Sequence, residues 1–389
     1  MALNFQQVFD RIKQIGLGAL HRQQTLDLQR EKASDLLVSW SEKTAQLAER
    51  VERARQVDPS VRCAIPLTEH LDAFHSAPGD EASVTLIAAD GSQILPDRHA
   101  ALLYSLVNVG AIILQPGFDK APAIFTDSAL LFADELYTET GSLTAEAIEQ
   151  HRDIQERRKL LELAKQVQGP VVAMTDGPVE LWGPKDGGEG EYRKNLELHK
   201  SVLSQLQALN VTVTGYVDKP GADLLIRTLE IATLSDEQMQ DLRRQHPLRG
   251  VTDLWLFGFL PAGCRSAVFG LQSGSRAHYT GDLGLHFFYL NVGTTGHPWM
   301  VRVEIPAWVA HDEGKLDMLQ RVLLEQCRLM GARPYPYILH RAHELAVVKF
   351  DERHQVEQML EVELRRAGGE VDVESNKQSA KNLPGRGTK

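Results

Sequence analysis

The sequence predicts an α/β fold in which a mixed β-sheet is flanked by helices, with a helical extension in front of it. Short apolar runs of strand length, such as 83–89 and 170–175, alternate with longer segments of helical periodicity. The second half of the chain is richer in strand patterns than the first. A hydrophobic fraction of 43% in 389 residues is enough for one large core with appendages.

The elements follow in order along the chain. Residues 1–57 are expected to form the helical extension, divided at Gly16 and Gly18 and lying on the chain's own core. A connector at 57–81 leads to the main domain at 83–352. The strands are expected at 83–89, 101–114, 170–175, 211–217, 253–260, 266–271, 285–292 and 299–305, and the helices at 142–167, 192–209, 312–329 and 338–350. The tail at 366–389 lacks apolar periodicity and is expected to be disordered.

Composition excludes several classes of protein. The net charge of −10 argues against a protein that coats nucleic acid by charge alone. It is compatible with a nuclease, because bound divalent ions offset an acidic metal site locally. The 3 cysteines are too far apart for a disulfide framework or a metal knuckle, which indicates a reducing compartment. With no signal peptide and no apolar run long enough for a bilayer, we expect a cytoplasmic protein without a membrane segment.

Two carboxylates follow apolar strands in the same way. Asp90-Gly91 comes after the run at 83–89, and Asp176-Gly177 comes after the run at 170–175, so a turn is expected at each. A carboxylate at the end of a buried strand is held by the sheet and faces the crevice where α/β sheets bind ligands. One Asp-Gly is an ordinary turn signal, but two after buried strands favour a site.

A third carboxylate is placed by helical spacing. Glu156 shares a stripe with Leu160 and Leu163, which is expected to face the sheet. A buried carboxylate must be paired or bound to a metal. Arg152, four residues earlier, offers an ion pair as the alternative, and Glu149 competes as the ligand, so both questions stay open.

The fourth candidate is His343, aligned with Leu339, Ala346 and Phe350 and therefore expected to face inward, with His340 more exposed. A lone histidine on an apolar face is more often a core residue than a ligand. Three carboxylates and a histidine nevertheless suit Mn²⁺ or Mg²⁺ better than Zn²⁺. Two such ions can activate water and stabilise the leaving oxygen of a phosphodiester.

Taken in order over 84–350, these segments resemble the NurA nuclease family. The resemblance rests on Asp90-Gly91-Ser92, Arg152-(x)3-Glu156, Asp176-Gly177, the segment Gly215 to Lys219, the paired strands Phe287–Tyr289 and Arg302–Pro306, and Tyr335–Tyr337 leading to His343. One departure is Pro178, which stands where serine is usual.

The resemblance implies an RNase H-like core with two bound Mn²⁺ or Mg²⁺ ions held by Asp90, Glu156, Asp176 and His343, with Lys219 near the scissile phosphate. It implies nuclease activity on single-stranded DNA and duplex ends in DNA end resection, repair or defence. The implied partners are a second copy of the chain and a HerA-type hexameric ATPase. The runner-up is a non-catalytic subunit that regulates the ATPase ring, favoured by the long N-terminal helices, the acidic balance and Pro178. A third possibility is an RNase H-like enzyme that cleaves RNA or a small phosphodiester.

Overall fold

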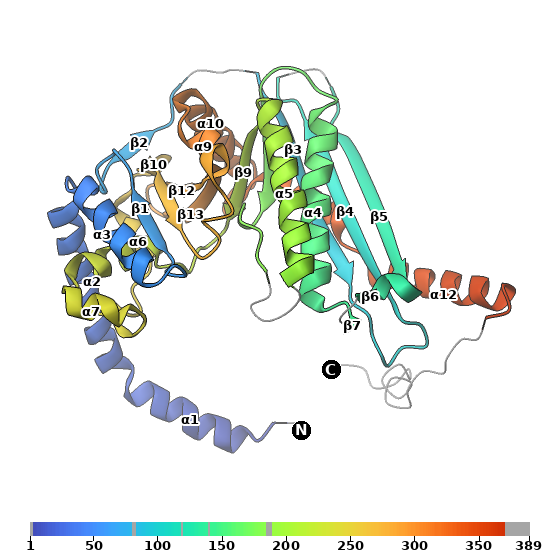
Figure 1. Cartoon of the computed structure of the whole chain (residues 1–389), viewed down its shortest axis with the longest axis horizontal. Coiled ribbons are helices and arrows are strands. Elements are labelled where there is room, and N and C mark those ends of the chain that lie inside the picture. Colours follow the sequence, from blue (N-terminus) through green and yellow to red (C-terminus); the bar gives the residue numbers. More distant parts are fainter. Residues whose placement is uncertain (1–2, 80–82, 118–119, 139–140, 184–188, 370–389) are drawn as a thin grey trace. The chain divides into compact units, whose positions relative to one another are not determined.

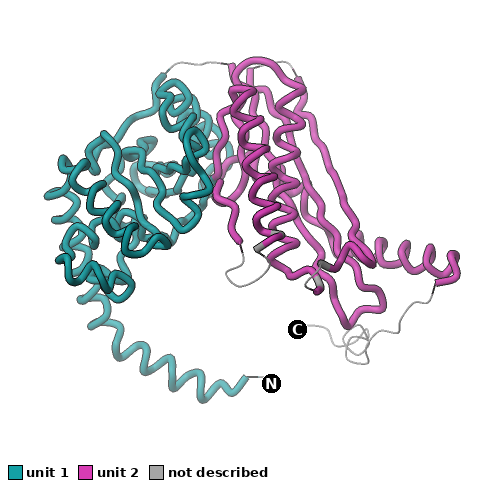
Figure 2. Tube along the Cα trace, in the orientation of Figure 1, with its two compact units in different colours: residues 1–80, 216–334 teal, residues 81–215, 335–389 magenta. Residues whose placement is uncertain are grey.

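A computed structural model describes residues 3–79, 83–117, 120–138, 141–183 and 189–369 of the chain. From residue 370 onward, the tail expected to be disordered lies outside the described residues. The chain divides into two compact units, shown in Figure 2. Unit 1 comprises residues 1–80 and 216–334, and unit 2 comprises residues 81–215 and 335–389. The described helices include none that is both long and apolar enough to cross a membrane.

The sheet of unit 2 confirms the predicted mixed α/β class. Its strands are β3 (Thr85–Ile94), β4 (Tyr104–Leu114), β5 (Ala123–Phe132), β8 (Val171–Asp176) and β9 (Thr212–Val217), in the order β9-β8-β3-β4-β5. Neighbours in the run β3-β4-β5 are antiparallel, whereas β8 is parallel to β3. The antiparallel strands β3, β4 and β5 lie side by side, and β8 and β9 extend the sheet next to β3. This strand order is that of an RNase H-like core. A small hairpin, β6 (Tyr137–Thr138) and β7 (Gly141–Ser142), follows the 3-10 turn η1 (Ala133–Leu136).

Four helices complete unit 2, namely α4 (Ala145–Ala164), α5 (Glu189–Ala208), α11 (Tyr337–Ala346) and α12 (Phe350–Arg366). Helix α4 begins as predicted, because the Thr144 side chain accepts a hydrogen bond from the backbone N–H of Ala147 at 3.2 Å. The helix predicted at 338–350 is shorter than expected. It ends at Ala346, and a separate helix that the sequence analysis did not predict starts at Phe350.

Two glycines let helices approach this sheet on opposite faces. A Cβ atom on Gly110 of β4 would lie 2.5 Å from the backbone nitrogen of Ala346 in α11. A Cβ atom on Gly91 of β3 would lie 2.5 Å from Cγ of Arg152 in α4. Gly110 pairs with Asp90, and successive residues of a strand point to opposite faces, so α11 and α4 cover opposite sides. Figure 1 shows α4 and α5 side by side in front of β3 and β4.

Unit 1 contains the helical extension and the remaining strands. Its helices are α1 (Phe5–Leu17), α2 (Ala19–Trp40), α3 (Thr44–Val57), α6 (Leu224–Thr233), α7 (Asp236–Gln240), α8 (Asp253–Leu256), α9 (Ala307–Ala310) and α10 (Glu313–Leu329), with 3-10 turns η2 (Leu242–Arg244), η3 (Phe257–Phe259) and η4 (Gly281–Leu283). Its strands are β1 (Cys63–Pro66), β2 (Phe74–Ser76), β10 (Cys264–Ser266), β11 (Phe269–Gln272), β12 (Leu285–Asn291) and β13 (Met300–Pro306). They run in the order β1-β11-β12-β13, and β10 pairs with both β12 and β2.

Several predictions about unit 1 were wrong. The strand expected at 253–260 is helix α8 followed by η3, because a short apolar run does not by itself distinguish a strand from a buried helical turn. The connector expected at 57–81 contains β1 and β2, whose pairing partners, β11 and β10, lie about 200 residues away in the sequence. The extension is broken near Ser41 as well as near Gly18, where a division was expected, so it forms three helices.

Asp253 is the centre of a buried polar network in unit 1. Its carboxylate accepts hydrogen bonds from the backbone N–H groups of Leu225 and Ile226, both at 2.9 Å, and from the hydroxyl of Tyr289 at 2.6 Å. Asp253 therefore satisfies the first turn of α6 and joins it to β12. Burial raises the pKa of Asp253 from 3.8 to about 6, although all three hydrogen bonds act to lower it.

We expect Gly110→Ala to destabilise unit 2 by about 1–3 kcal/mol, because the added methyl group overlaps the backbone of α11 rather than a mobile side chain. Thermal unfolding monitored by circular dichroism should show a clear loss of Tm. Gly190→Ala is the matched control, since a Cβ atom there meets nothing within 4 Å and the residue lies in helix α5. Equal Tm values for the two variants would contradict the close packing of α11 on β4.

We also expect Asp253 to make stability depend on pH. Because its pKa is higher in the folded state, its contribution is fully present below pH 3.8 and is lost as the pH rises to about 6. The loss amounts to about 3 kcal/mol. It should appear as a shrinking difference in unfolding free energy between the unmutated chain and Asp253→Asn from pH 4 to pH 7. The exposed Asp236→Asn is the control, and a difference that does not change with pH would disprove the prediction.

Candidate active site

Asp90 and Asp176 lie level with each other on adjacent parallel strands. The last pair in the register of β3 and β8 is Ala89 with Thr175, so the two aspartates are the next residues along. Strand β8 ends at Asp176, as predicted, but the turn predicted at Asp90 is wrong. Strand β3 continues to Ile94 because β4 pairs with it as far as Ile94 and Leu106. Asp90 is therefore held inside a strand, at the point where the neighbouring strand has ended.

Asp90 contacts His343 from helix α11. The Nδ1 atom of His343 lies 2.7 Å from Oδ2 of Asp90, and the two side chains are 62% and 16% exposed. The end of α11 is fixed to the sheet by Asn108, whose Nδ2 donates to the carbonyl oxygen of Ala346 at 2.8 Å, and by the Ser92 hydroxyl, which donates to the same oxygen. These contacts position His343 beside Asp90.

The prediction that His343 faces the core was wrong. Helix α11 buries Ile338, Leu339, Ala342 and Ala346 instead. His340, predicted to be the more exposed histidine, is 41% exposed and therefore more covered than His343. The expected apolar stripe from Leu339 to Phe350 requires one continuous helix. Helix α11 ends at Ala346, however, and Phe350 is exposed.

Glu156 is buried on helix α4, as its stripe predicted. Its residue is 5% exposed, and Leu160 and Leu163 on the same face are buried with it, whereas Glu149 is exposed. The alternative ion pair is also present, because Nε of Arg152 lies 3.3 Å from Oε1 of Glu156. Burial raises the pKa of Glu156 to about 8. The charges of Asp153 and Asp90 act in the same direction, while Arg157 and Arg152 oppose them.

Gly91 has a role at the site that the sequence analysis did not identify. It was interpreted as a turn residue, but it lies inside β3 and faces α4. A Cβ atom at this position would come within 2.7 Å of Oε1 of Glu156 and 2.5 Å of Cγ of Arg152. The absence of a side chain at Gly91 therefore allows the Glu156 carboxylate to lie directly over the strand that carries Asp90.

The loop after Asp176 is held by backbone packing. Gly177 has a φ of 82°, a left-handed conformation that favours glycine, and its N–H donates to Oδ1 of Asp176 at 3.0 Å. A Cβ atom on Gly215 of β9 would lie 2.5 Å from the carbonyl oxygen of Gly177. Arg157 donates to the carbonyl oxygen of Pro178 at 2.9 Å, a contact that uses the backbone and is open to any residue type. Pro178 is thus accommodated by the loop.

Lys219 is the one predicted site residue outside unit 2. It belongs to unit 1, two residues after the end of β9, and has a φ of 44°, which is unusual for a residue other than glycine. The other four predicted residues, Asp90, Glu156, Asp176 and His343, all belong to unit 2.

The side chains predicted to bind metal have the right chemistry for a divalent cation, but they are not arranged as a complete coordination site. Carboxylate oxygens and an imidazole are the donors that Mn²⁺ accepts, and Glu156 is a buried carboxylate whose charge is only partly offset. Within the described part of the chain, however, no group of three or more histidine, cysteine, aspartate or glutamate side chains is arranged to hold an ion. Instead, His343 contacts Asp90, and Arg152 forms an ion pair with Glu156.

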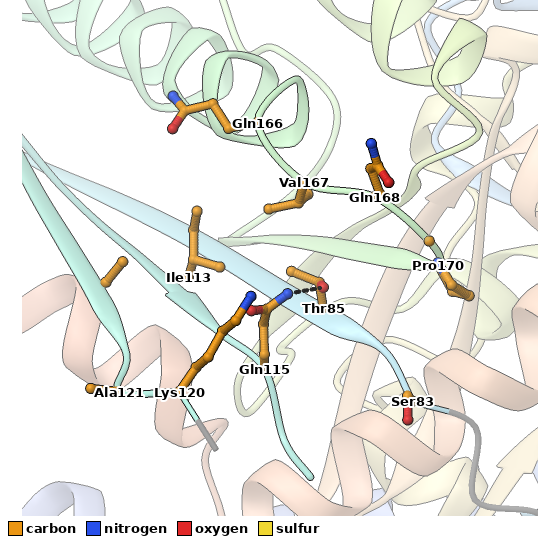
Figure 3. A pocket seen from close by; sticks show the side chains of 12 residues that line it. Ser83, Thr85, Ile113, Gln115, Lys120, Ala121, Gln166, Val167, Gln168 and Pro170 are labelled. Carbon is orange, nitrogen blue, oxygen red and sulfur yellow. Dashed lines mark hydrogen bonds between the residues drawn. The ribbon is translucent and has the colours of Figure 1, made fainter. Parts of the chain in front are cut away.

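A separate cavity of about 610 Å³ lies at the opposite end of β3 (Figure 3). Thr85 at the start of β3 accepts a hydrogen bond from Gln115 at 3.0 Å there, and Lys120, Gln166 and Gln168 line the same space. Asp90 is five residues further along the strand, which corresponds to about 17 Å. This cavity is therefore separate from the carboxylates described above.

Comparisons with solved structures give low similarity scores. The NurA nuclease from Sulfolobus solfataricus shares 12% identity at a TM-score of 0.47, over 86% of this chain and 98% of that one. Endonuclease V of Ciona intestinalis, solved in complex with DNA, shares 14% identity at a TM-score of 0.32, over 81% and 99% of the two chains. The catalytic domain of human endonuclease V also shares 14% identity at a TM-score of 0.32, over 82% and 98%.

Sequence comparison is more decisive. No curated protein matches the chain. The sequence pattern of the NurA domain, however, matches residues 84–348, which is most of the chain and includes all the predicted site residues. The chain belongs to the NurA family.

Proposed function

We propose that the chain is a Mn²⁺- or Mg²⁺-dependent deoxyribonuclease that acts on single-stranded DNA and on duplex ends. A NurA domain supports a nuclease in general terms. The structural observation that carries the finer proposal is the burial of Glu156 over Gly91, next to Asp90 on the same strand. Burial opposes the negative charge of Glu156, and the charge of Asp90 acts in the same direction, so a divalent cation bound beside them would compensate that charge.

The proposed ligands are Asp90, Glu156, Asp176 and His343, and two ions are expected. Ions bound there would activate a water molecule and stabilise the leaving oxygen of the phosphodiester. The chain itself fixes Asp90 in a strand and holds His343 in hydrogen-bonding distance of it. Arg152 balances Glu156 and also donates to Gln93 at 2.8 Å, so it has a second partner if Glu156 turns toward a cation.

The cellular role is proposed from the family. We propose a cytoplasmic enzyme of DNA end resection, repair or defence that works as a homodimer with a HerA-type hexameric ATPase, with Lys219 near the scissile phosphate. The buried, unpaired thiols of Cys63, Cys264 and Cys327 agree with a reducing compartment. Helix α1 exposes Phe5, Phe9 and Ile12 on one stripe, which agrees with a protein partner.

The alternative is a non-catalytic subunit that regulates the ATPase ring. One observation favours it: the described residues include no preassembled group of three metal ligands. Calorimetry with Mn²⁺ separates the two proposals. Heat of binding that disappears in Asp176→Ala supports the nuclease, and no binding by the unmutated chain supports the regulatory subunit.

We expect Asp90→Ala to reduce Mn²⁺-dependent cleavage at least about 100-fold, because even residues that only support metal ligands contribute 10- to 100-fold. The measurement is digestion of end-labelled single- and double-stranded DNA, with matched RNA strands to test the third possibility. Asp134→Asn, an exposed aspartate in the same unit, is the control. Cleavage that survives in Asp90→Ala would rule out the proposed mechanism.

For Glu156→Gln we expect loss of cleavage without loss of stability. The neutral amide avoids burying a carboxylate, and Arg152 keeps Asp153 at 2.8 Å as its partner. In metal-free buffer at pH 7, Tm should stay the same or rise. Glu149→Gln on the exposed face of α4 should change neither activity nor Tm. A marked fall in Tm for Glu156→Gln would instead identify the Arg152 pair as purely structural.

A further inference from the structure

A groove of about 540 Å³ begins two residues beyond Asp90. It is lined on one side by Ser92, Gln93 and Pro96, at and just after the end of β3. The other side is formed by Val348 and Lys349, which join α11 to α12, and by Phe350, which begins α12. Two residues of a strand span about 7 Å, so the groove adjoins the candidate active site. All of these residues belong to unit 2.

Phe350 is the most conspicuous side chain of this groove. It is the first residue of α12 and is 83% exposed, the highest exposure of any aromatic residue among those described. A phenylalanine left in water gains nothing for folding, since its apolar surface contributes only when it is covered. In the groove beside the site, its ring is available to pack against the flat, apolar face of a bound molecule.

Helix α12, which begins at Phe350, packs on the strand that carries Asp90. Val356, Leu360 and Leu364 of α12 pack on a cluster that includes Ile94 of β3 and Tyr104 of β4. The Tyr104 hydroxyl donates to Oε1 of Glu357 at 3.1 Å, and Arg353 holds the same oxygen at 3.0 Å. The backbone of Phe350 is thus positioned relative to Asp90 by a packed helix rather than by a free loop.

The charges of the groove favour a nucleobase over a phosphate alone. Asp351 and Glu352 place two negative charges in the first turn of α12, and Glu352 accepts from the backbone N–H of Lys349 at 2.7 Å. These charges disfavour a phosphate at the helix N-terminus. Arg353 is paired with Glu357, and Asp97 also lines the groove. Lys349 remains as a cation for a neighbouring phosphate.

We propose that Phe350 is a stacking platform for one unpaired base of the DNA strand whose phosphodiester lies at Asp90, with Lys349 contacting the backbone. This rests on the proposed nuclease function and adds a positioning residue to it. Every base has a π-face, so stacking holds the strand without reading its sequence. A base is free to stack only when unpaired, so Phe350 makes the enzyme favour single strands and frayed ends.

The test compares Phe350→Ala and Phe350→Trp in the full chain on a single-stranded oligonucleotide with Mn²⁺. We expect Phe350→Ala to raise KM about 5- to 150-fold with kcat nearly unchanged, and Phe350→Trp to restore KM. Because Phe350 is exposed, Tm should not change. Phe74→Ala, an exposed aromatic side chain in unit 1, is the matched control.

A second readout does not need cleavage. In an Asp90→Ala background, an oligonucleotide carrying 2-aminopurine should lose fluorescence on binding through stacking, and Phe350→Ala should abolish that quenching while Phe350→Trp keeps it. If the oligonucleotide is quenched but the unmutated chain cleaves no DNA, the stacking platform is supported and the proposed nuclease activity is excluded. If Phe350→Ala cleaves DNA with the same KM and shows the same quenching as the unmutated residue, the stacking platform is wrong and the nuclease proposal stands. A change in the oligomeric mass of Phe350→Ala would also contradict the stacking platform, because Phe350 would then contact a second copy of the chain.

Discussion

The candidate active site depends on the close approach of two helices to one pair of strands. Gly91 and Gly110 have no side chains at the two points where α4 and α11 contact β3 and β4. Because these glycines lie on opposite faces, Asp90 is placed between a helix that supplies Glu156 and a helix that supplies His343. The same packing fixes the end of α11 through Ala346, and the groove at Phe350 begins there. A larger side chain at Gly91 would displace Glu156 from β3, and one at Gly110 would displace the helix that carries His343.

The buried carboxylates of the two units differ in how their oxygens are satisfied, although burial raises the pKa of both. Asp253 accepts hydrogen bonds from two backbone N–H groups and from Tyr289, so its oxygens are satisfied within the fold. Glu156 has the Arg152 guanidinium at 3.3 Å, but it also feels Asp153 and Asp90, and burial raises its pKa to about 8. A carboxylate so poorly compensated is costly for stability, which is typical of positions kept for binding.

The segments that carried the family resemblance are of two kinds. Asp90-Gly91, Glu156, Asp176-Gly177 and His343 all belong to unit 2 and bear exposed or poorly compensated polar groups. Phe287–Tyr289 and Arg302–Pro306 are the paired strands β12 and β13 of unit 1, and they are buried. Arg302 and Glu304 form an ion pair at 2.8 Å with side chains 8% and 2% exposed. These strands are part of the buried core. A sequence motif alone does not show whether a segment forms the core or bears exposed polar groups.

The sequence by itself determined the alternation of strands and helices, the cap at Thr144, the buried face of α4 and the strand end at Asp176, because these follow from local periodicity and turn chemistry. Tertiary structure decided the rest. The continuation of β3 through Asp90 depends on β4, whose pairing residues supply hydrogen bonds that no local pattern reveals. The exposure of His343 and Phe350 depends on where α11 ends against the sheet. The spacing of side chains along a helix is local, but which face meets a partner is settled only when distant strands have paired.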